Sequence, residues 1–339
     1  MMDKFDIIEF KALDGFPLNL WHFKSEKPTV KGPVLLVHGA GVRANIFNAP
    51  TEKNIIQALY EDGYDVWLEN WRASIDLEPN EWDLDIVARN DHPAAVQKIV
   101  ELTGHNEFKA IIHCQGSTSF MISVSLGLVP QVTTIISNAV SLHPVVPKWS
   151  IFKLKFLVPI VNTMFDFINP QWGLEAPDFK TKMLRKLVKV THPEKDTLVG
   201  KFVSFTYGSG FPALWLLKNL NEKTKEWIQY EFADVPLSFF RHIRSCINTG
   251  VLVPKDKSTD QTYAPDNFKP NARIVLFSGV KNLCFLPDSQ KNTFEYLERM
   301  DPGVHRLYLL EEYSHLDVFF GKNSHIDVFP LMVDELNKS

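Results

Sequence analysis

The hydrophobic positions of this chain repeat in the rhythm of alternating strands and helices. Apolar and polar side chains alternate from Ile7 to Trp21 around a turn at Asp14 and Gly15, which predicts an antiparallel hairpin at a sheet edge. Residues 34–37 are continuously apolar, as is typical of a central parallel strand. The same reasoning predicts strands at 64–68, 108–113, 133–136, 273–277 and 306–310, and helices at 53–60, 85–102, 118–128, 289–300 and 327–336. This alternation indicates an α/β fold with a doubly wound, mostly parallel sheet.

The rhythm stops between residues 142 and 265. This stretch is rich in aromatic residues and has no clear strand–helix alternation; its aromatic residues include Trp149, Phe152, Phe156, Trp172, Trp215 and Trp227. We expect a mainly helical cap, or lid, at residues 142–265, inserted into a core formed by residues 1–141 and 266–339. A chain of 339 residues fits this arrangement, because α/β folds with an inserted cap reach such a length as one unit.

The segment from Ala110 to Val146 contains no Asp, Glu, Lys or Arg and is long enough to suggest a membrane span. Gly116, Gly127 and Pro130 interrupt it, however, and it divides into a strand, a helix and a second strand. A strand–helix–strand unit that is buried on every side has the same composition. We therefore expect no transmembrane segment.

Composition narrows the class of protein further. Apolar residues make up 45% of the chain and charged residues 22%, which is ordinary for a soluble enzyme, and a net charge of −4 gives no case for nucleic acid. The three cysteines are too few for a disulfide framework, and residues 1–6 lack the features of a signal peptide. We expect a cytoplasmic protein without a metal, since its histidines and cysteines show no metal-ligand spacing, and without a cofactor.

Cys114 is the leading candidate for a covalent nucleophile. It follows the predicted strand 108–113 directly and precedes Gln115, Gly116 and a predicted helix, which is the layout of a nucleophile elbow. A helix N-terminus favours an anion, and the reactive form of a cysteine is the thiolate. A free cysteine more often only fills space, and Ile112 stands where the elbow pattern has a small residue.

The other candidate residues follow the ends of neighbouring strands, where open α/β sheets place their sites. The glycine-rich segment 38–41 could aim the Ala40 backbone N–H at a developing oxyanion, together with the N–H of Gln115. The same glycines would equally suit a tight turn. His315 follows the last predicted strand, where the order nucleophile, acid, histidine requires the general base.

The residue that orients the histidine has two candidates. Asn282, after the strand 273–277, can accept the imidazole N–H and fix the ring, although it cannot stabilise an imidazolium by charge. Asp288 could act instead, but it precedes a helix and has the position of a capping residue. Asp317 is expected to brace the histidine loop, and His113 is ranked low because adjacent side chains point apart.

Four segments resemble one known family. The sequences GYDVWLEN at 63–70, DHPA at 91–94, HCQG at 113–116 and YSHLDVFFG at 313–321 are similar to the acid (gastric and lysosomal) lipase branch of the α/β-hydrolase family, where HSQG stands in place of HCQG and DHPA matches a helix start. The resemblance covers most of the chain outside the cap and implies a nucleophile, a histidine and an acid beneath a lipid-accepting cap. Cys114, Asn282 and Ile112 depart from the lipase pattern. A cysteine before Gln-Gly is similar to the elbow of polyhydroxyalkanoate synthases.

Three functions remain open at this point. The first is an esterase- or thioesterase-like hydrolase of an apolar acyl substrate, with an acyl-Cys114 intermediate. The second is an acyltransferase that passes the same acyl group to an amine, hydroxyl or thiol. The third is a hydrolase fold that has lost catalysis and binds a ligand or partner. The pattern does not identify the acyl group or the oligomeric state.

Overall fold

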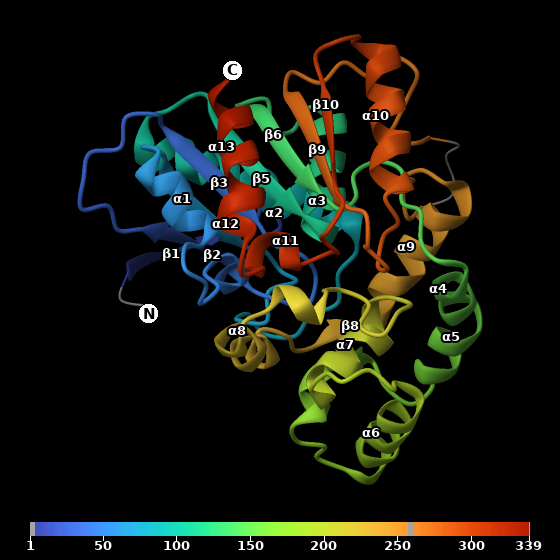
Figure 1. Ribbon diagram of the computed structural model, residues 1–339. Coiled ribbons are helices and arrows are strands. Elements are labelled where there is room, and N and C mark those ends of the chain that lie inside the picture. Colours follow the sequence, from blue (N-terminus) through green and yellow to red (C-terminus); the bar gives the residue numbers. More distant parts are fainter. Residues whose placement is uncertain (1–3, 257–260, 339) are drawn as a thin grey trace.

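The computed structural model describes residues 4–256 and 261–338, so residues 1–3, 257–260 and 339 of the expected core and cap lie outside the described part. Eight strands form one sheet in the order β1-β2-β4-β3-β5-β6-β9-β10 (Figure 1). Their bounds are β1 Phe5–Lys11, β2 Pro17–Phe23, β3 Pro33–Val37, β4 Asp65–Asn70, β5 Phe108–His113, β6 Val132–Asn138, β9 Arg273–Gly279 and β10 Arg306–Leu310.

The pairing confirms the predicted sheet. β1 and β2 form the antiparallel hairpin at one edge, and β2 pairs antiparallel with β4. All other neighbours in the sheet are parallel, from β4 through β3 and β5 to β10. Every residue of β3 is buried, which explains its continuous apolar run.

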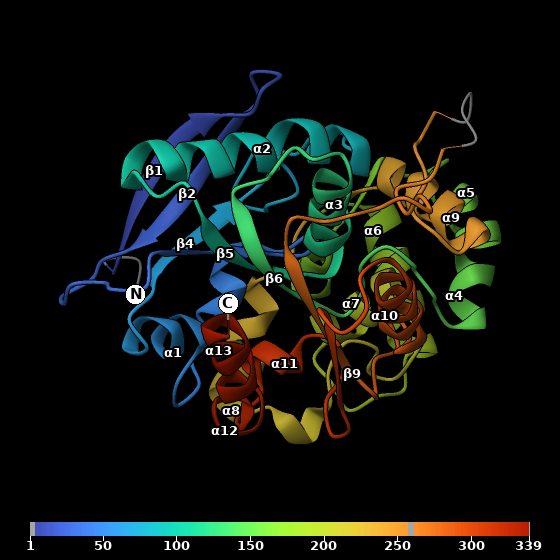
Figure 2. The same cartoon turned by 90° about the horizontal axis from the view of Figure 1, so that it is seen from above.

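Helices cover both faces of the sheet (Figure 2). α2 (Leu84–Thr103) and α3 (Cys114–Ser125) lie together on one face, and α1 (Ile55–Glu61) lies with α13 (Phe329–Asn337) on the other. α2 begins where the Asp83 side chain caps it and ends at Gly104, whose φ of 73° closes the helix in the left-handed conformation. Near the carboxyl end of the chain lie α10 (Asp288–Met300), α11 (Asp317–Phe320) and α12 (Ser324–Asp327), and the turn η2 (Ala44–Phe47) follows β3.

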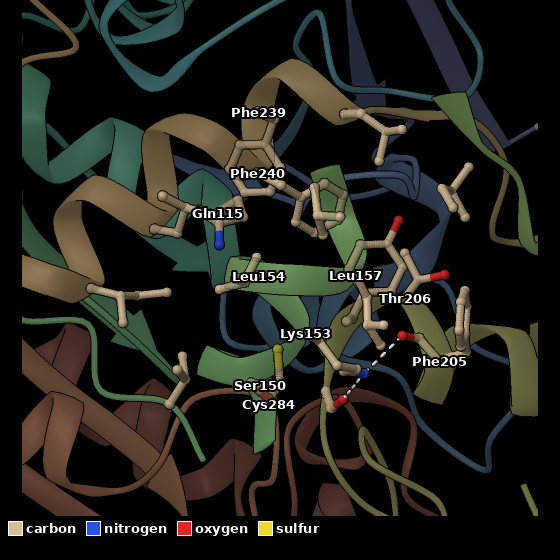
Figure 3. Close-up of a pocket in the computed structure, with 18 of the residues that line it drawn as sticks. Gln115, Ser150, Lys153, Leu154, Leu157, Phe205, Thr206, Phe239, Phe240 and Cys284 are labelled. Carbon is tan, nitrogen blue, oxygen red and sulfur yellow. Dashed lines mark hydrogen bonds between the residues drawn. The ribbon is translucent and has the colours of Figure 1, made fainter. Parts of the chain in front are cut away.

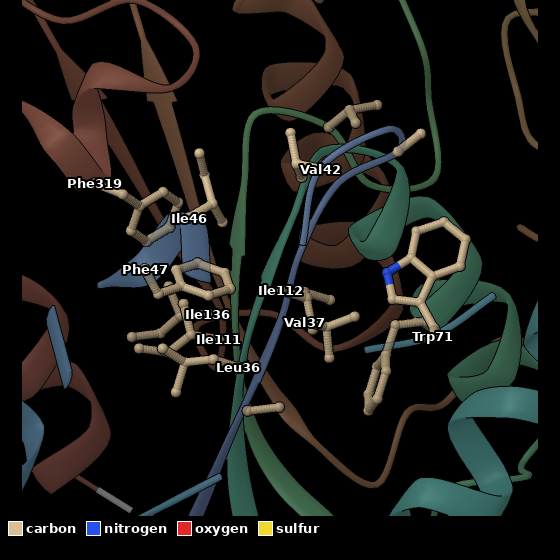
Figure 4. Close-up of a cluster of buried hydrophobic side chains, with 14 of the residues drawn as sticks. Leu36, Val37, Val42, Ile46, Phe47, Trp71, Ile111, Ile112, Ile136 and Phe319 are labelled. Carbon is tan, nitrogen blue, oxygen red and sulfur yellow. The ribbon is translucent and has the colours of Figure 1, made fainter. Parts of the chain in front are cut away.

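The core is built from the central strands. Figure 4 shows their aliphatic side chains packed against aromatic rings from the flanking segments; the labelled residues are Leu36, Val37, Val42, Ile46, Phe47, Trp71, Ile111, Ile112, Ile136 and Phe319, all buried. The uncharged stretch from 110 to 146 divides into β5, α3 and β6, as predicted. Within the described ranges, none of the helices has both the length and the apolar character needed to cross a bilayer.

The segment between β6 and β9, residues 139–272, is called the insertion below. Its described part contributes no strand to the eight-stranded sheet; most of its helices lie beyond one end of that sheet, and its last residues run back to the start of β9 at the other end (Figure 1). It contains α4 (Lys148–Phe152), η3 (Lys153–Leu157), α5 (Val158–Val161), β7 (Phe167–Ile168), η4 (Pro170–Gly173), α6 (Phe179–Thr191), α7 (Leu198–Tyr207), η5 (Leu217–Asn219), α8 (Glu222–Trp227), η6 (Ile228–Tyr230), β8 (Val235–Pro236) and α9 (Leu237–Thr249).

Two buried polar pairs fix α2 and α3 against the sheet. Asp91 accepts hydrogen bonds from the Arg72 guanidinium at 2.6–3.0 Å, and both side chains are buried. His92 bonds to Glu69 at 2.9 Å through Nδ1 and to the hydroxyl of Ser119 at 2.7 Å through Nε2. Asp91 and His92 lie in the middle of α2, so the expectation that this motif begins a helix is wrong. The motif instead connects α2 to β4 and to α3.

Candidate active site

Cys114 occupies the sharp turn between β5 and α3. Its φ is 56°, and among the described residues only Ala139 is another non-glycine residue with positive φ. Such a conformation is strained for a residue with a side chain and persists only where the surroundings hold it. The strand, the strained residue and the helix follow one another as in a nucleophile elbow.

Close backbone contacts hold this turn. A Cβ added at Gly116 would lie 2.1 Å from the carbonyl oxygen of His38, so α3 can approach the end of β3 only with glycine at this position. Ile112, two residues before Cys114, pairs with Val37 of the neighbouring strand and is fully buried in the core (Figure 4). The bulky side chain therefore finds its space in the sheet core, and the turn forms without the usual small residue.

The environment of the Cys114 thiol favours the thiolate. Burial on its own would raise the pKa of Cys114. Three effects outweigh burial and hold the pKa of Cys114 well below its usual value of 9.0: a hydrogen bond from the neighbouring Cys284, electrostatic attraction and a hydrogen bond from His315, and the backbone N–H of Gln115. The pKa of Cys284 is raised by its contact with Cys114 and by burial, so the proton of this pair resides on Cys284.

His315 lies in the loop after β10 and is buried beside the thiol. Ligand atoms of His113, Cys114 and His315 all lie within 4.8 Å of one another. The side-chain nitrogen of Asn282 is 3.1 Å from Nδ1 of His315. Two predicted partners of Cys114, which are 168 and 201 residues away in sequence, are therefore brought to it by the ends of β9 and β10.

The amide of Asn282 is turned opposite to our expectation. Its side-chain oxygen accepts the backbone N–H groups of Cys284, at 2.9 Å, and Phe285, at 3.1 Å. The NH₂ group therefore faces His315, and Nδ1 of the ring is the acceptor. The ring proton then sits on Nε2, which donates toward the Cys114 sulfur. The prediction that Asn282 accepts the imidazole N–H is wrong because two backbone donors occupy its oxygen.

Ala40 and Gln115 stand where an oxyanion hole would lie. They follow the parallel neighbours β3 and β5, so their backbone N–H groups come to the same end of the sheet. Within residues 4–256 and 261–338, the Ala40 N–H has no acceptor. The Gln115 N–H is directed at the Cys114 sulfur. Their role as oxyanion donors stays a prediction.

Asp288 is not brought to the histidine. It lies in the first turn of α10, its side chain is 58% exposed, and it pairs with Lys291 at 3.4 Å. The orienting position beside His315 is occupied by Asn282 instead.

Asp317 braces the histidine loop, as expected. One carboxylate oxygen accepts the Ser314 N–H at 2.7 Å, and the other accepts the Leu216 N–H at 3.0 Å and the Asn219 amide at 2.8 Å. Burial raises the pKa of Asp317 to about 6, although these hydrogen bonds favour the ionised form. The carboxylate thus ties the loop that carries His315 to the insertion.

His113 and Cys284 lie at the site although the sequence analysis gave them no role there. The His113 ring is centred 4.8 Å from that of His315, and its Nδ1 is 2.9 Å from the amide nitrogen of Asn138. Burial holds the pKa of His113 well below 6.5, so the ring is neutral. His113, Cys114 and His315 could ligate a soft cation, but only by engaging the thiolate itself. The spacing Asn282-x-Cys284 was a signal that a second thiol shares the loop.

A largely apolar pocket opens from Cys114 into the insertion (Figure 3). Its lining includes Cys114, Gln115, Leu154, Leu157, Phe205, Phe239, Phe240, Ile243, Cys284 and Phe285. Lys153 is the charged exception: its amine donates to the backbone carbonyls of Phe205, at 2.8 Å, and Gly208, so it closes the end of α7. Burial lowers the pKa of Lys153 to about 8.

The chain is similar to known lipases and esterases. No family model matches it. Sterol esterase 2 of Saccharomyces cerevisiae is 28% identical over 371 aligned positions, which cover 93% of this chain and 66% of that protein. Triacylglycerol lipase 1 of Arabidopsis thaliana is 22% identical, with 94% of this chain and 84% of that protein covered. The chain thus spans just under two thirds of the length of sterol esterase 2.

Comparison with a solved structure identifies the fold. The monoglyceride lipase of Saccharomyces cerevisiae, determined as a soluble variant with a substrate analogue, has a TM-score of 0.59 at 14% identity and covers 98% of this chain and 96% of its own. At this identity the likeness concerns the fold alone. Together with the sheet order described above, it identifies the α/β-hydrolase fold.

Proposed function

We propose that this protein, which has the α/β-hydrolase fold, hydrolyses esters or thioesters of apolar acyl groups through a covalent acyl-Cys114 intermediate. One observation carries the proposal: a strained, low-pKa thiol lies within 4.8 Å of a ring nitrogen of His315 and lines an apolar pocket. The similarity to a sterol esterase and a triacylglycerol lipase supports an ester substrate.

The first half-reaction needs no separate base. The Cys114 thiolate attacks the acyl carbonyl carbon and forms a C–S bond, and the electron pair of the carbonyl moves to its oxygen. The N–H groups of Ala40 and Gln115 donate to that oxyanion. When the intermediate collapses, the bond to the leaving alkoxide or thiolate breaks, and the acyl group remains on Cys114 as a thioester. A thiolate can leave without a proton, whereas an alkoxide takes one from water.

The second half-reaction is where this site departs from a serine hydrolase. Water that attacks the acyl-enzyme has to give up a proton, and His315 accepts it on Nε2 only when the ring proton moves to Nδ1. The Asn282 amide faces Nδ1 with its own N–H, which disfavours that form of the ring. Hydrolysis of the acyl-enzyme is therefore slow. A slow hydrolysis favours the second candidate function, transfer of the acyl group to an amine or thiol that is already a good nucleophile.

The insertion supplies the acyl site in this proposal. We assign residues 142–265 as the cap, because the apolar side chains of η3, α7 and α9 form most of the pocket wall next to Cys114 (Figure 3). Apolar lining with few polar groups suits an acyl chain or another lipid, which gains free energy by leaving water. The polar side chains of this wall are few compared with its apolar ones, which favours an acyl chain over a sugar or a peptide.

Turnover of a series of p-nitrophenyl esters tests the proposal. We expect release of p-nitrophenol to increase with acyl length from acetate to octanoate and to disappear in Cys114→Ala. Cys246→Ala is the matched control, because Cys246 is buried in α9 and bonds to a backbone carbonyl rather than to the site. Equal activity in wild type and Cys114→Ala would refute the acyl-Cys114 intermediate, and no activity in either would leave only a binding protein with a hydrolase fold.

A further inference from the structure

The hydroxyl of Tyr207 is fully buried and has no hydrogen-bond partner among the described residues. Buried hydroxyl groups are almost always paired, because burial without a partner forfeits the hydrogen bonds made to water. Tyr207 is the last residue of α7, and burial keeps its pKa well above 10, so the hydroxyl remains a donor. An unpaired donor inside a pocket is typical of a group whose partner arrives with the ligand.

The hydroxyl lies against Gly41, the residue that follows Ala40 in the proposed oxyanion turn. A Cβ added at Gly41 would be 2.0 Å from the Tyr207 oxygen, so the hydroxyl occupies the space that a side chain would take at this position. Gly41 follows Ala40, and Tyr207 lines the same pocket as Cys114 and Gln115. The insertion thus places one O–H beside the two backbone N–H groups contributed by the sheet.

The ring of Tyr207 is held in place by the insertion and not by the substrate. It packs near Phe232, with ring centroids 6.1 Å apart, and an added Cβ on Gly41 would also touch Val235. Ala233 donates its backbone N–H to the carbonyl of Gly41 at 3.2 Å, which joins the segment beside Tyr207 to the oxyanion turn. The position of the hydroxyl is therefore fixed relative to Ala40.

We propose that Tyr207 is a catalytic residue that donates a third hydrogen bond to the oxyanion formed on the acyl carbonyl during attack by Cys114. The proposal rests on the proposed function, because it requires acyl transfer to Cys114. It means that the insertion completes the catalytic site as well as lining the acyl pocket. No proton is transferred by Tyr207 in this role; the hydroxyl donates when the oxyanion forms and is released when the intermediate collapses.

Tyr207→Phe tests the proposal, because it removes the hydroxyl and keeps the ring. We expect kcat for acylation by p-nitrophenyl octanoate to fall about 100- to 1000-fold, the range for loss of an oxyanion donor, while KM changes less than about twofold. Tyr230→Phe is the matched control, since Tyr230 belongs to the insertion and is exposed. The melting temperature of Tyr207→Phe should not fall, because the buried hydroxyl that is removed makes no hydrogen bond in the folded protein.

A tetrahedral adduct gives a second measurement. An alkyl trifluoromethyl ketone forms a hemithioketal with the Cys114 thiolate and carries the oxyanion, and the corresponding alkyl alcohol binds without one. Tyr207→Phe should weaken binding of the ketone at least about tenfold and leave the affinity for the alcohol unchanged. Equal loss of both, or loss of neither, overturns the role of Tyr207. A wild-type protein that is not acylated at all would refute the proposed function instead.

Discussion

Asn282 presents its side-chain NH₂ to Nδ1 of His315, at 3.1 Å, because its side-chain oxygen is held by two backbone N–H groups of the same turn. The ring proton of His315 consequently lies on Nε2, toward Cys114. In this arrangement the histidine stabilises a thiolate by donating to it and is a poor base for water. The relationship predicts fast acylation and slow deacylation.

Asn282→Asp should relieve the slow step. A carboxylate can keep the two backbone N–H groups on one oxygen and accept Nδ1–H on the other, which allows His315 to take a proton on Nε2. We expect steady-state hydrolysis to rise about 100-fold, which is the lower end of the range for general base catalysis. Burst kinetics measure acylation and deacylation separately. Slower or unchanged deacylation would show that the amide orientation does not limit the reaction.

Removal of the amide should have the opposite effect. In Asn282→Ala the ring of His315 loses its orienting contact and no longer directs Nε2–H at the thiolate, so acylation should slow enough to limit turnover, which should fall. Asp288→Ala is the control, because Asp288 is exposed and pairs with Lys291, and its turnover should match the wild type. The reverse outcome would transfer the orienting role to Asp288.

The ionisation of Cys114 can be read from alkylation. Since Cys284 and His315 hold the pKa of Cys114 well below 9.0, the rate of reaction with iodoacetamide should already be at its plateau at pH 8 and should fall only in acid. In Cys284→Ala the titration should move to higher pH, because one donor to the thiolate is lost. Cys246→Ala should leave the profile unchanged. A wild-type profile that still rises between pH 8 and 10 would contradict a preformed thiolate.

Asp317 makes stability depend on pH in a defined direction. Its pKa is raised from 3.8 to about 6 by burial, so the folded state binds the proton more tightly than the unfolded state. The free energy of unfolding should therefore fall as pH rises from 4 to 6, by up to about 3 kcal/mol for this group. Urea unfolding at each pH measures this free energy of unfolding. Asp317→Asn should lose this part of the slope, and an unchanged slope would refute the assignment.

The buried pair of Arg72 and Asp91 should carry far more stability than a surface pair. Arg72→Met leaves Asp91 buried without its cation, which should lower the free energy of unfolding by about 3–5 kcal/mol. Lys98→Met removes the exposed partner of Glu101 and should cost less than about 1 kcal/mol. Denaturant unfolding compares the two variants. Similar losses in the free energy of unfolding would mean that the buried pair does not stabilise α2.

The sequence predicted the fold well because strands and helices are encoded locally. The hydrophobic periods placed the edge hairpin and the central strand, predicted at 34–37 and observed at 33–37, close to their observed positions. The order of strand ends also placed Ala40, Cys114 and His315 together, since parallel strands bring their carboxyl ends to one edge. The catalytic roles of these residues stay predictions.

The contacts that sequence could not give depend on packing between distant segments. The direction of the Asn282 amide is decided by the backbone of the turn that follows it, and the position of Tyr207 is decided by how the insertion folds onto Gly41. For the same reason, Asp91 and His92 were expected at a helix start but lie in the middle of α2. The partner of Asp91 is Arg72, just after β4, and the partners of His92 are Glu69 on β4 and Ser119 on α3.

The central claim, a covalent acyl group on Cys114, is tested most directly by intact mass spectrometry after rapid mixing with an activated octanoyl ester. The account predicts a wild-type species heavier by one octanoyl group, mapped to Cys114 by peptide digestion, longer-lived than in Asn282→Asp and missing from Cys114→Ala. An unmodified wild-type protein, or an adduct that persists in Cys114→Ala, would contradict it.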